Sequence, residues 1–185
     1  KAIENGIDII RIFDALNDVR NMKKAIEFTN KYGGHAQGTI VYTTSPIHDI
    51  DQFVETAKEL EEIGSDSLCL KDMAGLLTPY RSYELVKRLK EEIDIPVQLH
   101  SHNTSGMAAM TYLKGAEAGV DVIDTAISAL ASGTSQPPTE SLVATLRDTE
   151  YDPGIDLDSI VDIAGYFRKI RDNYKKFQGS FATDP

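Results

Sequence analysis

The sequence has 185 residues, of which 41% are hydrophobic and 26% are charged, enough for one globular domain with a sizeable core. Its formal net charge is −10 and it contains no basic block, so we expect neither nucleic acid nor an anionic membrane surface as the main partner. No apolar run approaches the ~20 residues of a membrane helix and no signal peptide opens the chain, so we expect a cytoplasmic protein without membrane insertion. Cys69 is the single cysteine, so we expect no internal disulfide and a buried, inert thiol.

Short apolar runs alternate with longer amphipathic runs along the chain. The short runs are rich in Val and Ile and predict buried parallel strands at Ile7–Phe13, Ala36–Tyr42, Ser67–Leu70, Val97–His100 and Val120–Ala126. The amphipathic runs predict helices at Val19–Tyr32, Ile50–Ile63, Pro79–Ile93, Ser105–Ala118, Thr139–Arg147 and Leu157–Phe177. Strand starts recur roughly every 25–31 residues, the size of one βα unit, so we expect five such units in one domain piece.

The helix ends carry capping residues. Gly33, Gly64 and Gly119 follow predicted helices at positions where a left-handed C-cap is favoured. Asp49 and Thr78 precede predicted helices and are candidate N-caps. At the two ends of the chain, we interpret residues 1–5 as the tail of an earlier helix and residues 179–185 as a turn-like segment.

Five βα units build either an open, doubly wound sheet or most of a barrel, and periodicity does not decide between them. No Gly-x-Gly-x-x-Gly follows a predicted strand, so nucleotide binding by an open sheet has no motif behind it. Both architectures place function at the carboxyl ends of the strands. Most chemically capable side chains gather there, in the segments 11–18, 42–44, 71–75, 100–106 and 124–137. This asymmetry indicates an enzyme.

The sharpest local signal is the pair His100 and His102. Residues i and i+2 of an extended chain point to the same face, so both imidazoles can reach one metal ion. The alternative is two partly exposed loop histidines with ordinary hydrogen bonds. Their place at a strand end, before a turn that contains glycine, favours the metal site. His35 and His48 lack such a context, and we expect a strand-start and a loop histidine.

Lys71 directly follows the apolar run that ends the third predicted strand. A lysine at such a strand end must be paired, bound to substrate, deprotonated or modified. One alternative is a salt bridge to Asp72 or another acid; the other is addition of carbon dioxide to the neutral amine, which gives a carbamate able to bind a metal. Asp72 itself suits either a supporting role at the site or a helix cap.

Two further residues leave alternatives open. Arg11 is a cation within an apolar strand, and either binds a substrate carboxylate or pairs with Asp14 or Asp124. Thr134 lies in a Gly-Thr-Ser-Gln-Pro turn, where its hydroxyl could shuttle a proton. The residues alone favour a simple hydrogen bond that closes the turn.

Taken together, five segments in order resemble the carboxyltransferase domain of biotin-dependent enzymes, a group that includes pyruvate carboxylase, the oxaloacetate decarboxylase α subunit and transcarboxylase. The matching segments are RIFDALND (Arg11–Asp18), KDMAGLLTP (Lys71–Pro79), LHSHNTSGMA (Leu99–Ala108), EAGVDVIDTAIS (Glu117–Ser128) and GTSQPPTE (Gly133–Glu140). The run from 124 to 141 looks more like the oxaloacetate decarboxylase α subunit, or the B subunit of two-subunit pyruvate carboxylases, than the single-chain enzyme.

The resemblance implies a (β/α)₈ TIM barrel that moves a carboxyl group between carboxybiotin and pyruvate or oxaloacetate. It implies a divalent metal, zinc or manganese, bound by His100, His102 and carbamylated Lys71. Thr134 would carry a proton, and two residues would lie near the substrate, Arg11 and Tyr42. The implied partners are the 2-oxo acid and a biotin carrier domain or subunit.

The sequence also departs from the family pattern. The family's fourth metal ligand, an aspartate in Arg-Asp-x-x-Gln on the first barrel strand, and its Ala-Met-Lys-Met biotin-attachment segment do not occur. We therefore expect residues 1–185 to form the C-terminal part of the barrel, about its last five βα units, with open sheet edges that favour an oligomer. The alternatives are a metal-dependent Claisen-type synthase or lyase, against which Lys71 and the Thr-Ser-Gln-Pro turn count, and an inactive barrel fragment.

Overall fold

The computed structural model describes residues 1–179, so residues 180–185 of the predicted terminal turn lie outside the described part. One parallel sheet contains β1 (Ile9–Ile12), β2 (His35–Val41), β3 (Ser67–Asp72), β4 (Val97–Ser101) and β5 (Val122–Ile123). The helices are α1 (Val19–Lys31), α2 (Ile50–Glu62), α3 (Pro79–Glu92), α4 (Ala108–Glu117), α5 (Thr139–Leu146) and α6 (Leu157–Asp172), with short 3-10 helices at Ile3–Asn5, Ser128–Leu130 and Lys175–Phe177.

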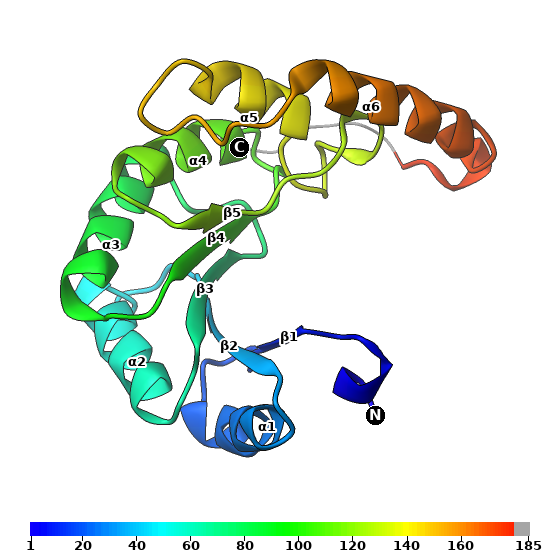
Figure 1. Cartoon of the computed structure of the whole chain (residues 1–185). Helices are drawn as coiled ribbons and strands as arrows, with labels where there is room; N and C mark the ends of the chain where they lie inside the picture. Colours follow the sequence, from blue (N-terminus) through cyan, green and yellow to red (C-terminus); the bar gives the residue numbers. More distant parts are fainter. Residues whose placement is uncertain (180–185) are drawn as a thin grey trace.

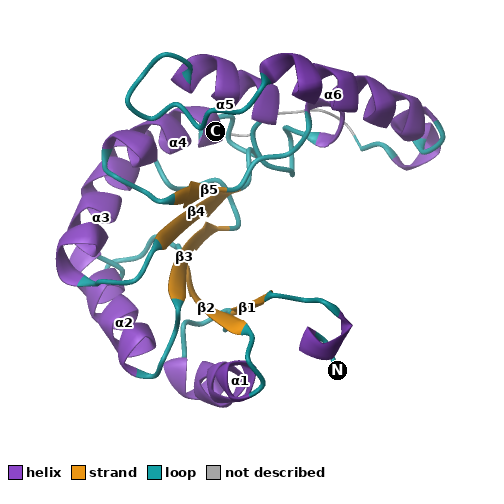
Figure 2. Ribbon diagram, viewed as in Figure 1, coloured by secondary structure: helices purple, strands orange, loops and turns teal. Residues whose placement is uncertain are grey.

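The strands lie side by side in chain order, from β1 to β5. The sheet curves into an arc with α1 to α4 on its outer side, while its inner side stays open (Figures 1 and 2). A doubly wound sheet would reverse its strand order and carry helices on both faces. The strand order therefore excludes a doubly wound sheet and confirms the curved parallel sheet of a partial TIM barrel. The helices α5 and α6 continue this arc beyond β5 (Figure 1).

The core lies between the sheet and its outer helices. Ile40, Leu70 and Leu99 occupy neighbouring strands, and each is fully buried against that helical layer. Side chains of α2 and α3 such as Phe53 and Leu85 fill the same core. Burial of each such side chain contributes about 1.5–3 kcal/mol, so the outer layer holds the arc together.

The predicted caps are confirmed with one exception. Gly33, Gly64 and Gly119 all have positive φ, and the carboxylate of Asp49 accepts a hydrogen bond from a backbone N–H in the first turn of α2. Thr78 occupies the N-cap position of α3, but its side chain makes no capping hydrogen bond.

Every predicted strand and helix is found, with at least one bound that differs from the prediction. Four of these differences have a clear structural setting. β3 runs on through Asp72, so Lys71 belongs to the strand itself. α4 begins at Ala108 rather than Ser105, because the side chain of Asn103 caps the Ala108 N–H. β5 is shorter than predicted, because it pairs regularly with β4 only at two positions and forms the edge of the described sheet. α6 ends at Asp172, before the separate 3-10 turn.

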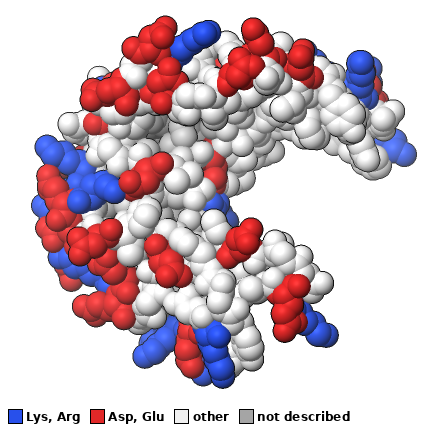
Figure 3. All heavy atoms as spheres, viewed as in Figure 1, with Lys and Arg blue, Asp and Glu red and all other residues white. Residues whose placement is uncertain are grey.

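Charge is distributed unevenly over the molecule. In the face that Figure 3 shows, charged side chains crowd the outer helices, whereas the concave inner side is mostly uncharged. Because the inner side of the arc is mostly uncharged, the few polar and charged side chains that it carries are candidates for a functional site. Among residues 1–179, no helix is long and apolar enough to cross a membrane.

Candidate metal centre at the carboxyl ends of the strands

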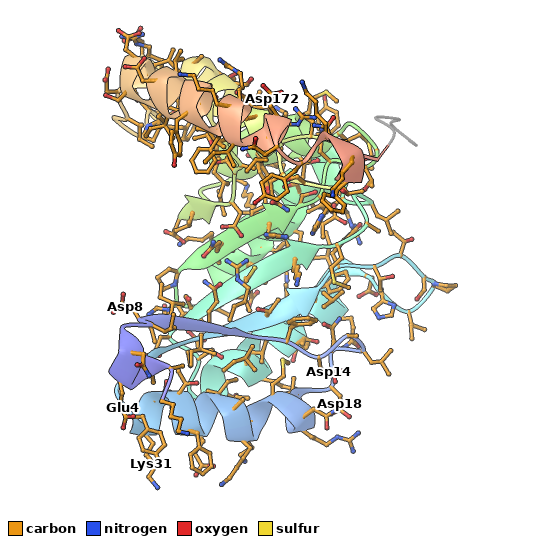
Figure 4. The ribbon with its side chains drawn as sticks, turned by 90° about the vertical axis from the view of Figure 1, so that its right-hand side faces the viewer. Glu4, Asp8, Asp14, Asp18, Lys31 and Asp172 are labelled. Carbon is orange, nitrogen blue, oxygen red and sulfur yellow. The ribbon has the colours of Figure 1, made fainter. Side chains whose placement is uncertain are left out.

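The carboxyl ends of the strands define one end of the arc. Figure 4 faces the open side and labels Asp14 and Asp18, which follow β1, at the opposite end from Asp8, which precedes it. Lys71 of β3 and His100 of β4 are register partners near this carboxyl end. Register partners project from the same face of a sheet, and this is the inner face because the alternate positions pack against the helices.

His100 and His102 are brought together as predicted. Their Nε2 atoms lie 3.2 Å apart, and their rings meet edge to face. Two nitrogen ligands that each lie about 2.1 Å from one ion, at an angle between about 90° and 109°, are roughly 3.0–3.4 Å apart. The pair therefore already has the spacing of two ligands on a shared ion.

The other nitrogen of each ring is held by an acceptor. His100 Nδ1 lies 2.7 Å from a carboxylate oxygen of Asp124, and His102 Nδ1 lies 2.5 Å from the carbonyl oxygen of Thr134. Since both partners only accept, each Nδ1 carries the proton in the neutral ring, and each Nε2 keeps its lone pair. Metal-binding histidines typically have this arrangement.

Arg11 pairs with Asp124, one of the two alternatives for a salt bridge. Arg11 Nη1 donates to Asp124 Oδ2 at 2.8 Å, and Arg11 Nε donates to Gln37 Oε1 at 2.6 Å. Asp14 instead accepts hydrogen bonds from the loop after β1, including the backbone N–H of Leu16. Substrate binding by Arg11 stays a prediction.

Asp124 is a residue of the candidate site that the sequence suggested only as a partner of Arg11, whereas the structure also places it beside His100. Burial alone would raise the pKa of its carboxyl, but hydrogen bonds from His100 and Arg11 lower that pKa to about 2. Asp124 is therefore an anion at neutral pH. The signal in the sequence was a single acid at the inward position just after the fifth strand.

Lys71 does not form the salt bridge to Asp72 that was one alternative. Its ammonium lies 4.0 Å from the centre of the Phe13 ring. Asp72 faces the other side of the sheet, is fully buried and accepts hydrogen bonds from the backbone of Leu76 and Leu77 and from Ser101. The Asp72 carboxylate thus holds the backbone of the loop that leads to α3.

The described residues supply only part of a complete ligand set. Within residues 1–179, no group of three or more His, Cys, Asp and Glu side chains is arranged to hold a metal ion. His100 and His102 therefore need a further donor. Lys71 is the register neighbour of His100, and as a carbamate it would add an anionic oxygen ligand.

The turn that contains Thr134 packs against the loop after β4. Its backbone is closed by a 2.9 Å hydrogen bond from Ser132 N–H to the Gln136 carbonyl, and Asn103 N–H donates to the Ser135 carbonyl at 2.8 Å. Thr134 is exposed, and its backbone carbonyl rather than its side-chain hydroxyl contacts His102. The hydroxyl's role in proton transfer stays a prediction.

Tyr42 does not lie beside the candidate metal centre formed by His100 and His102. Its side chain is buried in the core on the helical side of the sheet, where its ring stacks on Phe53 with centroids 5.3 Å apart. Burial raises the pKa of its phenol, against the lowering effect of nearby Arg81. The structure gives it a packing role on the face opposite the two histidines.

The remaining sequence expectations for single residues are confirmed. Cys69 is fully buried, and burial raises the pKa of its thiol to about 12. His35 begins β2 and lies 2.6 Å from Ser67 Oγ, while His48 sits in a loop beside Ser45. Neither histidine reaches the candidate metal centre.

Comparison with known proteins places the chain in a family. The HMGL-like family model matches residues 12–166. The pyruvate carboxylase B subunit of Methanocaldococcus jannaschii is 65% identical over 95% of this chain and 31% of that protein. The methylmalonyl-CoA carboxyltransferase 5S subunit of Propionibacterium freudenreichii is 44% identical over 100% of this chain and 37% of that protein.

A solved structure agrees with these matches. The carboxyl transferase domain of Rhizobium etli pyruvate carboxylase with pyruvate has a TM-score of 0.97 and 37% identity, and covers 100% of this chain and 32% of that one. The chain thus spans about a third of the length of the B subunits and of the solved domain that it matches. It belongs to the HMGL-like family and is similar to the carboxyltransferase parts of pyruvate carboxylases, as its five motifs indicated.

Proposed function

We propose that this protein transfers a carboxyl group between biotin and pyruvate or oxaloacetate at a divalent metal ion bound by Lys71, His100 and His102. The observation that carries the proposal is the 3.2 Å spacing of the two Nε2 atoms, with both Nδ1 atoms held by acceptors. The two histidines lie at the carboxyl ends of the strands, and the active sites of TIM-barrel enzymes lie at that end of the barrel.

The relatives support the choice of substrate. Two relatives at 65% and 55% identity are B subunits of pyruvate carboxylase, and one at 43% is the large subunit of a 2-oxoglutarate carboxylase. The Rhizobium etli domain is described with pyruvate and biocytin and with oxamate and biotin. We infer that this protein acts on a 2-oxo acid, with pyruvate favoured by the higher identities.

The transfer breaks one carbon–carbon bond, moves the carboxyl group to a nitrogen and moves one proton in the opposite direction. When oxaloacetate is the donor, its terminal carboxyl leaves, and the electron pair of the broken carbon–carbon bond stays on the carbon beside the ketone. That carbon takes the proton of the biotin ureido nitrogen, which receives the carboxyl group; the reverse direction exchanges these roles. The Thr134 hydroxyl is our proposed proton carrier, since a hydroxyl can accept and donate in one step.

The residues of the site would divide the remaining work. His100 and His102 supply neutral nitrogen ligands, which suit zinc or manganese, and Lys71 supplies an oxygen ligand once its amine has added carbon dioxide. When bound, a divalent ion supplies Lewis-acid polarisation of a carbonyl oxygen. A biotin carrier domain or subunit is the proposed partner, while a cytoplasmic location and an oligomeric assembly stay predictions.

The test is an assay of oxaloacetate decarboxylation by the natural-length protein, with and without free biotin. We expect pyruvate to form several-fold faster with biotin, and the His100→Ala/His102→Ala double variant to lose this increase. A parallel incubation with acetyl-CoA and a 2-oxo acid tests the Claisen-type alternative. Product formation from acetyl-CoA, with no response to biotin, would replace the proposed function by that alternative.

A further inference from the structure

The carboxylate of Asp124 is held from three sides. Its Oδ2 atom accepts from His100 Nδ1 at 2.7 Å and from Arg11 Nη1 at 2.8 Å, and its Oδ1 atom accepts from the side-chain amide of Gln98. Charge-assisted hydrogen bonds of this kind are roughly twice as strong as neutral ones. Both oxygens are therefore fixed, and so is the plane of the carboxylate.

These contacts belong to a closed ring of four side chains. Arg11 Nε donates to Gln37 Oε1 at 2.6 Å, Gln37 Nε2 donates to Gln98 Oε1 at 2.8 Å, and Gln98 and Arg11 both donate to Asp124. Each amide accepts through its oxygen and donates through its nitrogen, so the ring is self-consistent. We call these four residues the inner ring: Arg11, Gln37, Gln98 and Asp124.

The inner ring joins residues that are distant in the sequence. Arg11 and Asp124 are separated by 113 positions, and the ring members come from β1, β2, β4 and the end of β5. Gln37 is only 3% exposed, and its amide also donates to Ser67 on β3. The ring thus ties all the strands of the described sheet together below the two histidines.

We infer that Asp124 is a positioning residue, which the inner ring holds in place so that it fixes the His100 ring with Nε2 directed toward the metal. The inference rests on the proposed metal centre. Asp124 contacts neither His102 nor Lys71 through any hydrogen bond found among the described residues, so it acts through His100. Groups that orient a metal-binding histidine in this way typically change metal affinity by roughly 10- to 100-fold when they are replaced.

The experiment compares Co²⁺ binding by metal-free, natural-length wild type and variants, because the visible absorption of Co²⁺ reports its coordination geometry. Asp124→Ala removes the anchor, and Asp124→Asn leaves one acceptor oxygen for three converging donors. Gln37→Met breaks the inner ring at a residue that does not contact His100. Asp121→Asn is the matched control, since Asp121 lies near the other end of β5 and pairs with Lys90 at 2.7 Å.

We expect Asp124→Ala to weaken Co²⁺ affinity by roughly 10- to 100-fold, Asp124→Asn and Gln37→Met by smaller factors with altered spectra, and Asp121→Asn to change neither. If Asp124→Ala does not fold, the other two variants decide. Wild-type affinity and spectra in every folded variant of Asp124 and Gln37, beside a loss of binding in His100→Ala, would overturn the positioning role alone. Unchanged binding in His100→Ala would overturn both this role and the proposed metal centre.

Discussion

The Nε2 atoms of His100 and His102 face each other at 3.2 Å, while their Nδ1 atoms bond to Asp124 and to the carbonyl of Thr134. Two lone pairs at this separation repel each other unless a proton or a cation lies between them. The hydrogen bonds behind the rings therefore hold a geometry that metal binding would relieve. The site is preorganised by contacts made on the side away from the ligand.

Lys71→Arg should abolish metal binding and biotin-dependent transfer while the fold is kept. Arginine keeps a cation that can lie over the Phe13 ring, but it does not form the carbamate. Metal content and decarboxylation rate are the measurements, with Lys90→Arg on the outer surface as the control. Full activity in Lys71→Arg would refute the ligand role.

Gly75→Ala should disturb the metal centre through the backbone. Gly75 has a φ of 71°, and a Cβ there would lie 2.8 Å from the carbonyl oxygen of His102. We expect a stability loss of about 1–3 kcal/mol, with weaker metal binding because the loop after β4 must move. Gly119→Ala is the control, since it has a φ of 91° with no atom within 4 Å of the new Cβ. Equal effects on metal binding in both variants would show that backbone strain alone is responsible.

Thr134→Ala should separate the backbone from the hydroxyl. Metal content should stay stoichiometric, because the contact with His102 is made by the carbonyl oxygen, which alanine retains. Biotin-dependent transfer should be lost, and Thr134→Ser should keep it, if the hydroxyl carries the proton. Melting temperature and oxaloacetate decarboxylation are measured in parallel. Near-normal transfer in the alanine variant would end the proton-carrier role.

Tyr42→Phe should lower stability by about 1 kcal/mol and leave the KM for the 2-oxo acid unchanged. The phenol is buried on the helical side of the sheet, where its ring packs on Phe53 beside Arg81. Thermal unfolding and steady-state kinetics give the two values. A rise in KM without loss of stability would restore the substrate-binding role that the family resemblance implied.

The sequence predicted the features that depend on short-range rules. The two-residue period of an extended chain placed His100 and His102 on one face, and the apolar runs located the buried strands. Asp49 and the glycines after the helices were recognised by their capping chemistry. Each of these needs only residues that lie close together in the chain.

Features that depend on pairing between distant strands were missed. Periodicity did not give the strand order, and that order separates a barrel from an open sheet. The contacts of Asp124 with His100 and Arg11 depend on the register of β5 with β4 and on the position of Arg11 at the other edge of the sheet. The family resemblance implied that Tyr42 lies near the substrate, but the alternation of side chains along β2 turns its ring toward Phe53 of α2, and the substrate role stays a prediction.

The most direct test of the central proposal is the metal content of the purified natural-length protein, measured by elemental analysis in wild type and in the His100→Ala/His102→Ala double variant. We predict one equivalent of zinc or manganese in the wild type and none in the double variant, with both proteins folded by circular dichroism. A double variant that keeps one tightly bound equivalent would contradict the metal centre on which the proposed carboxyl transfer depends.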